Sequence, residues 1–315
     1  MKYLLFIVLC IPQIAFCKTL IFTTAFNRPD FVDFQDKLFK KFIQDDYEYI
    51  VFSDANTKEL KKEMRNVCER LNIKCIDIPQ HIHQQPYLPR LPGDNLHQPN
   101  IRNCNAVQWA WDNYMSKHEG PVLLIDSDMF LIRPFSPREL MNQYDVAFVS
   151  WGTVDPVTNI GYDFMWIALI CFNMGTLPEL NSLCFNCGRL PNTYTSIDSG
   201  GWTHLYLQKY RNQLNIKYIS WVCGYEFYCP YKYAHPDLQR PKQISSEVII
   251  KNLRERSFSE DEIELVLQQP DTIELLLDNH FLHYRAGTNY EKYSKDHLDK
   301  KERILLSFFD RILSK

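Results

Sequence analysis

Residues 121–131 read Pro-Val-Leu-Leu-Ile-Asp-Ser-Asp-Met-Phe-Leu, an apolar run that leads directly into two carboxylates spaced by one residue. A continuous apolar run of this length is typical of a buried strand, so we predict a strand that ends at Ile125. Asp126 and Asp128 then lie together at its carboxyl edge, within reach of one cation. A solvated turn is the competing interpretation of two aspartates. The buried strand that precedes them in mid-chain favours a cation site, because hard divalent ions take carboxylate oxygens and often keep substrate phosphates as further ligands.

Strand-like and helix-like segments alternate on the amino-terminal side of this stretch. The periodicity predicts strands over 19–22, 47–52 and 74–78 and helices over 30–43, 58–71 and 101–114. Such alternation predicts an α/β fold with a mostly parallel central sheet flanked by helices. Ligands of these sheets bind beyond the carboxyl ends of the strands, so Thr23, Thr24 and Asp54 are candidate residues for binding a cofactor or another ligand.

The rest of the chain continues as one domain. We predict a strand over 144–149, helical segments over 257–277 interrupted by Pro270, and an amphipathic terminal helix over 300–313. Residues 79–100 carry five prolines and three histidines, and a loop of this length is usually functional, for example as a lid, or disordered. No internal repeat or linker divides the sequence, so the domain is predicted to span 18–315.

The first seventeen residues are predicted to be a secretory signal. Lys2 precedes an apolar stretch over 3–16, which is shorter than the roughly 20 residues of a spanning helix, and the small side chains of Ala15 and Cys17 fit cleavage before Lys18. We therefore expect an exported chain, secreted or in the lumen of the secretory pathway, with no stable transmembrane anchor. An uncleaved anchor and a buried amino-terminal element are the alternatives.

Composition sets further bounds. The 315 residues are 45% hydrophobic and 23% charged, which excludes a wholly disordered or coiled-coil chain. The net charge of −3 argues against a nucleic-acid partner, whose binding would need a basic surface. Of the ten cysteines, Cys10 and Cys17 leave with the signal, and an even number in an exported chain predicts disulfides without choosing their pairing. A four-thiolate zinc site built from Cys184, Cys187, Cys223 and Cys229 is the less favoured alternative.

Two chemistries place paired aspartates after a buried strand. Phosphatases of the haloacid-dehalogenase type usually carry the pair near the start of the domain, with a small or β-branched residue after it, whereas here Met129 and Phe130 follow it in mid-chain. The segment instead resembles the Asp-x-Asp motif of GT-A-fold glycosyltransferases. The strand–helix alternation before it is similar to the nucleotide-binding half of those enzymes. The resemblance implies a GT-A-like fold, the fold of nucleotide-diphospho-sugar transferases.

Two downstream segments extend the resemblance. Residues 169–175, Leu-Ile-Cys-Phe-Asn-Met-Gly, resemble the Phe-Asn-x-Gly segment of family 8 and related enzymes. Residues 196–202 stand where such enzymes often have an Asp-Gln pair facing the reacting sugar, although Ser199 replaces the Gln. The resemblance makes Asn173 and Asp198 candidate catalytic residues that hold donor or acceptor hydroxyls, with Asp198 also a candidate base. Asn173 as a turn former is the competing interpretation.

A third segment, residues 280–287, resembles the late His-x-x-Gly segment that supplies a third metal ligand and contacts the diphosphate. The spacing is one residue longer than in that pattern, so the implied ligand is His283 or, as the weaker alternative, His280. Arg285 is the implied phosphate contact. A histidine satisfied within the core is the competing interpretation of His283.

The resemblance also implies the remaining roles. Asp126 would bridge the nucleotide ribose and the metal, and Asp128 would bind the metal directly. With His283 they form a mixed oxygen and nitrogen set that suits Mn²⁺ or Mg²⁺. Arg102 occupies the place of a donor-binding arginine, with a surface salt bridge as its competing interpretation.

The sequence therefore predicts a metal-dependent glycosyltransferase. It would transfer a sugar from a nucleotide-sugar donor, a UDP-sugar by our expectation, to a hydroxyl of a carbohydrate, protein or lipid acceptor. The alternative is a non-catalytic exported protein that keeps the fold as a surface for binding sugars or nucleotides.

Overall fold

The structure is a computed structural model. It describes residues 17–84, 87–91, 98–155, 157–191, 193–194, 196–223, 226–228, 246–268, 273–277, 279–284 and 295–315. The predicted signal over 1–17 therefore lies outside the described residues apart from Cys17. No helix within these ranges is both long enough and apolar enough to span a bilayer.

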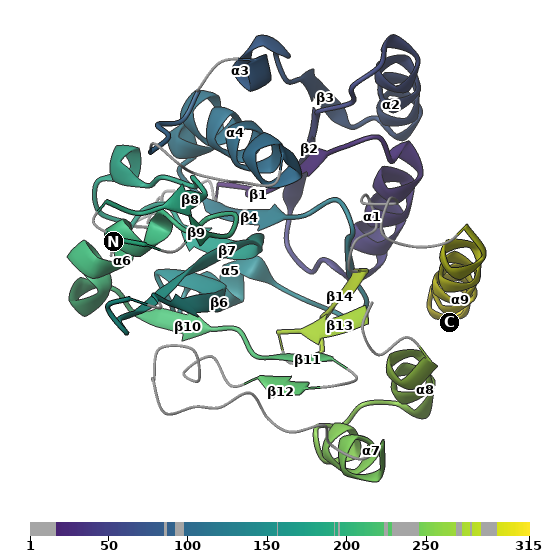
Figure 1. Cartoon of the computed structure of the whole chain (residues 1–315). Helices are drawn as coiled ribbons and strands as arrows, with labels where there is room; N and C mark the ends of the chain where they lie inside the picture. Colours follow the sequence, from purple (N-terminus) through teal and green to yellow (C-terminus); the bar gives the residue numbers. More distant parts are fainter. Residues whose placement is uncertain are drawn as a thin grey trace, which may run out of the picture.

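A seven-stranded sheet forms the centre of the molecule (Figure 1). Its strands are β1 (Thr19–Ala25), β2 (Tyr47–Ser53), β3 (Lys74–Asp77), β4 (Pro121–Ile125), β6 (Val146–Val154), β7 (Gly161–Asn173) and β10 (Ile216–Tyr218). They lie in the order β10-β6-β7-β4-β1-β2-β3. β3, β2, β1 and β4 run parallel, and β7 runs antiparallel to both of its neighbours. The predicted α/β fold with a mostly parallel sheet is thus confirmed.

A second sheet continues from the acidic stretch. Its strands are β5 (Met129–Leu131), β11 (Trp221–Cys223), β12 (Glu226–Tyr228), β13 (Ile273–Leu276) and β14 (Phe281–Tyr284). They pair antiparallel in the order β12-β11-β13-β14-β5. A further short pair consists of β8 (Gly188–Arg189) and β9 (Ser196–Ile197). The turn between β4 and β5 therefore carries the chain from the main sheet into the second one.

Nine α-helices are defined among the described residues. They are α1 (Pro29–Phe42), α2 (Lys58–Leu71), α3 (His81–Gln84), α4 (Gln98–Asn113), α5 (Pro137–Met141), α6 (Thr203–Tyr210), α7 (Ser246–Glu255), α8 (Glu260–Gln268) and α9 (Lys295–Ser314). α2 has the predicted bounds because both ends are capped. The Thr57 hydroxyl accepts from the Leu60 amide at 3.2 Å, and Asn72 ends the helix in the left-handed region at φ 58°.

The helices cover both faces of the main sheet because its strands alternate apolar side chains between them. On one face, Phe22 and Leu124 pack with α4 and α6 around Trp111. On the other face, Ile21 and Ile125 pack with α1 and α2. A third core fills the space between the outer side of α1, the second sheet and helices α7 to α9. α1 therefore lies between two cores, and its buried polar residues can reach the turn that joins the sheets.

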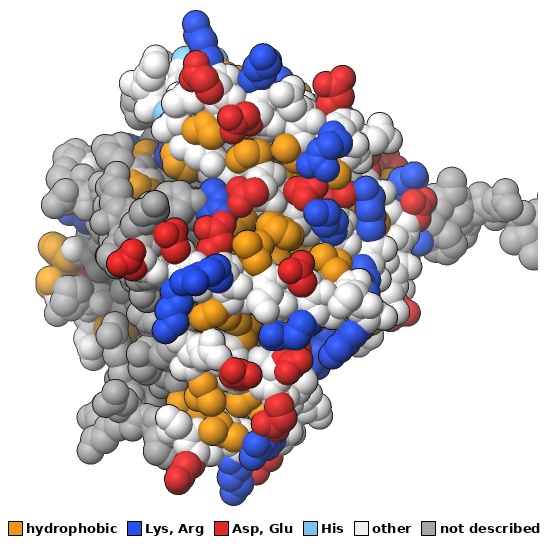
Figure 2. All heavy atoms as spheres, turned by 90° about the vertical axis from the view of Figure 1, so that its right-hand side faces the viewer, with side chains coloured by type: hydrophobic (Ala, Val, Ile, Leu, Met, Phe, Trp, Pro, Cys, Tyr) orange, Lys and Arg blue, Asp and Glu red, His pale blue; other side chains and the backbone are white. Residues whose placement is uncertain are grey.

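The prediction of helix over 257–277 is partly wrong. α8 accounts for its first half, but Ile273–Leu276 forms β13, which pairs with β11 and β14. Ile-Glu-Leu-Leu has no strong local preference against helix, so pairing with two distant strands decides its conformation. The predicted terminal helix is confirmed as α9. Figure 2, which views the right-hand side of Figure 1, shows basic and acidic side chains interspersed around small apolar areas on that face.

Candidate functional site

The acidic turn stands where the sequence predicts it. β4 ends at Ile125, and the Asp126 amide donates to the Ala168 carbonyl of β7 at 2.9 Å, which ties the start of the turn to the neighbouring strand. The Met129 amide closes the turn on the Asp126 carbonyl at 3.1 Å. The Ser127 amide donates to Asp126 Oδ1 at 2.8 Å. The two carboxylates therefore sit on a turn whose backbone is fixed at both ends.

Gln35 of α1 hydrogen-bonds to the backbone of the same turn, a role that the sequence did not predict. Its Nε2 donates to the carbonyls of Asp126 and Met129 at 2.9 and 2.8 Å. The Tyr49 hydroxyl donates to Gln35 Oε1 at 2.5 Å, so the amide has only one orientation that satisfies all three bonds. The available signal was a polar residue four positions after Phe31, on the apolar face of a predicted helix.

β14 brings His283 to the acidic turn. The Tyr284 amide donates to the Asp128 carbonyl at 2.8 Å, and β14 pairs with β5 so that His283 lies opposite Met129. His283 Nε2 lies 3.5 Å from Asp128 Oδ1, and both side chains are buried. The indole of Trp166 on β7 meets the imidazole edge to face, with 5.1 Å between ring centres. Residues far apart in the sequence therefore converge on Asp128, as predicted for His283.

The electrostatics of the turn show an excess of negative charge. Burial and the neighbouring Asp128 carboxylate raise the pKa of Asp126 to about 7, although His283 and the Ser127 amide act in the opposite direction. Both causes disfavour the charged form of the Asp126 carboxyl. A divalent cation at the turn would act in the opposite direction and favour the carboxylate.

The donor set fits a hard or intermediate cation in part. A cation with ligands at about 2.1 Å holds neighbouring donor atoms about 3 Å apart, close to the 3.5 Å between Asp128 and His283. Among the residues that the structure describes, however, no group of three or more His, Cys, Asp or Glu side chains is placed to hold a metal ion. The chain thus offers a pair of ligands, with Asp126 beside them. Mg²⁺ and similar ions commonly use one or two protein ligands and take the rest from phosphates and water.

A second charged cluster lies at the carboxyl end of β2, where a buried carboxylate meets groups from three other residues. Arg102 Nε lies 2.7 Å from Asp54 Oδ2, and Arg102 Nη2 donates to Asp54 Oδ1 at 2.8 Å. His83 Nε2 lies 2.9 Å from Asp54 Oδ1, and Gln80 Oε1 accepts from Arg102 at 3.0 Å. Asp54 is only 3% exposed. The structure therefore pairs two of the predicted donor-binding residues with each other.

The predicted threonines lie at the same edge of the sheet but beneath its surface. Thr24 Oγ1 donates to Asn103 Oδ1 of α4 at 3.4 Å. Thr23 is fully buried, and its hydroxyl has no hydrogen-bond partner among the described residues. Both side chains are therefore part of the packed interior at this edge of the sheet.

Asp198 lies near the first turn of α4, which also carries Arg102. Its Oδ1 accepts from Asn100 Nδ2 and from the Ser199 amide, both at 2.7 Å. Gly200 follows at φ 85°, and a Cβ there would stand 2.3 Å from the Met165 carbonyl of β7. The exposed Asp198 carboxylate is thus held by α4, and the segment that carries it packs against β7.

Asn173 is a correction to the predicted site. β7 runs antiparallel to β4, so Asn173 pairs with Pro121 at the beginning of β4, whereas Leu169 pairs with Ile125 at its end. Asn173 therefore lies at the opposite edge of the sheet from Asp126. There its Nδ2 donates to the Met141 carbonyl at 3.0 Å, and its Oδ1 accepts from the Gly175 amide at 3.3 Å. These bonds make it a turn residue that cannot reach the acidic turn.

In contrast to Asn173, residues nearer the beginning of β7 lie close to the acidic turn. Trp166 stands beside His283, and Trp151 of β6 packs against Trp166 with ring centres 5.7 Å apart. Both indoles are half-buried. Arg285, the predicted phosphate contact, lies outside the described residues.

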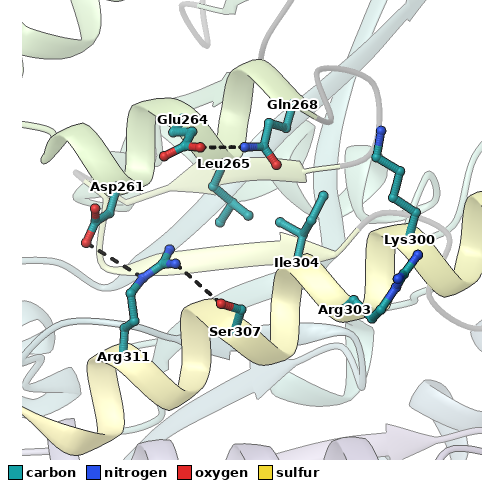
Figure 3. A pocket seen from close by; sticks show the side chains of 9 residues that line it. All are labelled: Asp261, Glu264, Leu265, Gln268, Lys300, Arg303, Ile304, Ser307 and Arg311. Atoms are coloured by element: carbon teal, nitrogen blue, oxygen red, sulfur yellow. Dashed lines mark hydrogen bonds and ion pairs between the residues drawn. The ribbon is translucent and has the colours of Figure 1, made fainter.

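A surface pocket of about 450 Å³ lies between α8 and α9 (Figure 3). Side chains of both signs line it, and Arg311 pairs with Asp261 across it at 3.7 Å. None of the predicted site residues contributes to it. The acidic turn and this pocket are therefore separate features.

Comparison with known proteins gives only distant structural likenesses. No protein-family model matches the chain, and no curated protein matches it. Among solved structures it resembles the bifunctional glycosyltransferase WbbM without ligand, at 12% identity and a TM-score of 0.34 over 54% of this chain and 34% of that one. It also resembles a mannosyltransferase from Pyrobaculum calidifontis in complex with GDP-Man and Mn²⁺, at 10% identity and a TM-score of 0.38 over 64% and 55%.

A third likeness is to the galactosyltransferase LgtC in complex with donor and acceptor sugar analogues, at 12% identity and a TM-score of 0.35 over 64% of this chain and 72% of that one. The matched region spans about a third of WbbM and about half of the mannosyltransferase. All three TM-scores lie below 0.5, so the function proposed below rests on the residues of this chain.

Proposed function

We propose that this protein is a metal-dependent glycosyltransferase that uses a nucleotide-sugar donor. The observation that carries the proposal is the convergence of His283, from the second sheet, on an acidic turn at the carboxyl edge of the main sheet, with 3.5 Å between His283 Nε2 and Asp128 Oδ1. In α/β sheets that edge is where ligands bind. The pKa of Asp126, which burial and the Asp128 carboxylate raise to about 7, supports the proposal, because such groups often lie at functional sites.

Asp128 and His283 would hold a divalent cation, Mn²⁺ or Mg²⁺, and Asp126 would orient the nucleotide ribose beside it. Two protein ligands leave coordination positions for diphosphate oxygens, which explains how an acidic site accepts an anionic donor. A bound cation supplies stabilisation of the charge that grows on the departing diphosphate. Gln35 keeps the two carboxylates in place by fixing the backbone of their turn.

The acceptor side is assigned to Asp198 and the two indoles. Asp198 is exposed, and its Oδ1 is fixed by Asn100 and the Ser199 amide, so the carboxylate can accept the proton of an acceptor hydroxyl from a set position. Trp166 lies beside His283, and Trp151 packs against Trp166; we assign these two half-buried indoles to contact with a sugar ring. A UDP-sugar as donor and a carbohydrate, protein or lipid acceptor complete the proposal.

Calorimetry and a donor screen test it. Wild-type protein is titrated with UDP and with GDP, each with and without MnCl₂, and is then assayed for hydrolysis or transfer of several nucleotide sugars. We expect nucleotide binding that depends on Mn²⁺ and turnover of at least one donor. Asp128→Asn should lose both, and Asp46→Asn should lose neither, because Asp46 is an exposed carboxylate before β2, at the opposite edge of the sheet.

The outcomes separate the alternatives. Metal-dependent binding without turnover of any donor would favour the non-catalytic binding protein. Binding that is unchanged in Asp128→Asn would overturn the metal site itself.

We also propose that the chain is exported and that residues 1–17 are removed. Thr19 begins β1 almost directly after the predicted cleavage point, so cleavage before Lys18 leaves the first strand whole. Intact-mass and amino-terminal peptide analysis of the protein from a secreting host should give Lys18 as the first residue. A chain that starts at Met1 would refute cleavage.

A further inference from the structure

Two cysteines meet beside the acceptor side of the candidate site. Cys104 lies on α4, and Cys187 lies directly before β8. Both side chains are fully buried and pack with Leu88 in a small cluster of their own. Their thiols form a hydrogen bond with each other. Two segments far apart in the sequence thus place two sulfur atoms in direct contact.

The surroundings of the pair are polar on both sides. Arg90 Nη1 lies 3.7 Å from Cys187 Sγ and donates to the Cys187 carbonyl at 3.1 Å. On the other side, the Cys104 thiol contacts Ser199 and the Gly200 backbone, the residues that follow Asp198. The pair therefore stands at the junction of α4, the segment with Arg90, and the segment with Asp198.

We propose that Cys104 and Cys187 form a disulfide in the mature protein, linking α4 to the segment that carries Asp198. The two thiols lose two protons and two electrons to an oxidised low-molecular-weight or protein disulfide, which leaves as two thiols while the new S–S bond forms. Because exchange starts from a thiolate, the contacts also indicate the order of events. The hydrogen bond from Cys104, together with the Arg90 guanidinium, lowers the pKa of Cys187, whereas burial raises the pKa of Cys104. The Arg90 guanidinium, 3.7 Å from Cys187 Sγ, favours the thiolate at Cys187.

The other described cysteines define the alternatives. Cys184 lies at the rim of the same cluster, three residues before Cys187, and is the competing partner. Cys68 and Cys75 form a second thiol contact, but they join α2 to the adjacent β3 and touch no part of the candidate site. Cys171 is equally buried, and its described interactions involve no second thiol. Among the thiol contacts of the described residues, only the one between Cys104 and Cys187 spans a long stretch of chain.

The link has a consequence for the site that is independent of the chemistry performed there. Asn100 and Arg102, on the first turn of α4, hold Asp198 and Asp54. A covalent bond between Cys104 and Cys187 fixes that turn relative to the Asp198 segment. The proposal therefore stands whether or not the protein is a glycosyltransferase.

Peptide mapping of the full chain tests the pairing directly. The protein is incubated with a mixture of oxidised and reduced glutathione, unfolded in the presence of iodoacetamide without reductant, digested and analysed by mass spectrometry. We expect a linked peptide pair that contains Cys104 and Cys187 and disappears on reduction. Alkylation of both cysteines, or a link from either one to Cys184, would overturn the proposal.

Thermal unfolding supplies a second readout. A disulfide that closes a loop of this length should make Tm fall by about 5–10 °C when a phosphine reductant is added. The reductant-dependent fall should be absent from the Cys104→Ala/Cys187→Ala double variant and retained in the Cys171→Ala control. A wild-type Tm that ignores the reductant after complete oxidation would contradict the link.

Discussion

Two charged clusters share the carboxyl edge of the main sheet, and they are built in opposite ways. Around Asp54, one buried carboxylate meets a guanidinium, an imidazole and a carboxamide from Arg102, His83 and Gln80. Around Asp128, two carboxylates meet one imidazole. In the first cluster, the carboxylate faces a guanidinium at 2.7 Å. In the second, burial and the neighbouring Asp128 carboxylate raise the pKa of Asp126 to about 7.

This difference favours the acidic turn as the candidate ligand site. Carboxyl groups whose pKa is strongly raised by burial and by a second carboxylate often lie at functional sites. The Asp54 cluster joins α4 to the end of β2 through Arg102. We therefore assign it a structural role, and we assign ligand binding to the acidic turn.

Asp128→Asn should separate activity from stability. Removing a cation ligand should lower the metal-dependent rate by about 10³-fold, because charge stabilisation of the leaving diphosphate is lost. Stability without metal should be unchanged or higher, since one of two repelling charges disappears. Initial rates with Mn²⁺ and Tm in the presence of a chelator measure the two effects. Equal losses of rate and stability would show that Asp128 is structural.

Arg102→Met should lower stability and leave the cation site nearly unchanged. It leaves the buried Asp54 carboxylate without its main counter-charge, which should cost about 2–3 kcal/mol and lower Tm by about 4 °C. Arg65→Met is the matched control, because Arg65 pairs with Asp77 at the surface and such pairs are worth less than about 1 kcal/mol. Affinity for Mn²⁺ should stay within about threefold. A loss of nucleotide affinity with unchanged Tm would instead make Arg102 a donor ligand.

The pH dependence of stability should report the uncompensated charge. The pKa of Asp126 is about 7 in the folded protein and about 4 when unfolded, so its contribution is fully present below pH 4 and is lost as the pH rises through 7. Asp126→Asn cannot lose that contribution. With metal chelated, the variant should gain about 4 kcal/mol on wild type between pH 4 and pH 8 in denaturant unfolding, because one pKa unit corresponds to about 1.4 kcal/mol. If the free energies of unfolding of variant and wild type differed by the same amount at every pH, the pKa of Asp126 would not be raised in the folded protein.

Gln35→Leu tests whether the fixed turn matters to the cation. The variant leaves the Asp126 and Met129 carbonyls without their side-chain donor, and it should weaken Mn²⁺ binding about tenfold. Tyr49→Phe removes only the bond that orients Gln35, so its effect should be smaller and in the same direction. Calorimetric Mn²⁺ titrations of folded protein measure both. Unchanged affinity in Gln35→Leu would reduce Gln35 to a packing residue.

Asn173→Ala should have the smallest effect on activity. The residue lies at the far edge of the sheet, so the rate should stay within about twofold of wild type. Loss of its bond to the Met141 carbonyl should cost about 1 kcal/mol of stability. A large fall in kcat with normal Tm would restore Asn173 to the catalytic residues.

Local sequence patterns predicted individual strands and helices, but they did not predict which distant residues would meet. The strand ending at Ile125 and the helix over 58–71 follow from apolar runs and end signals, and both are confirmed. The proximity of Asp126 and Asp128 follows from their spacing alone. The reach of His283 to the turn came from a family resemblance, because no local pattern pairs residues so distant in sequence.

The failures have one physical cause, which is strand direction and pairing. Asn173 ends a strand as Ile125 does, but β7 runs backwards, and a sequence does not display the direction of its strands. β13 is a strand because β11 and β14 flank it. The contact between Gln35 and the acidic turn likewise exists only after α1 has packed beneath β4.

The turn between β4 and β5 also constrains how the gene can change. Ile125, Met129 and Leu131 point into one core, and Phe130 points into another, on the far side of β5. Inserting or deleting one codon between Ile125 and Met129 would exchange the two sets, because successive side chains of a strand point to opposite faces. Substitutions within the stretch can be sampled one at a time, but a change in its length would disturb both cores and the cation site together. Related chains should therefore vary in the letters of residues 121–131 and keep their number.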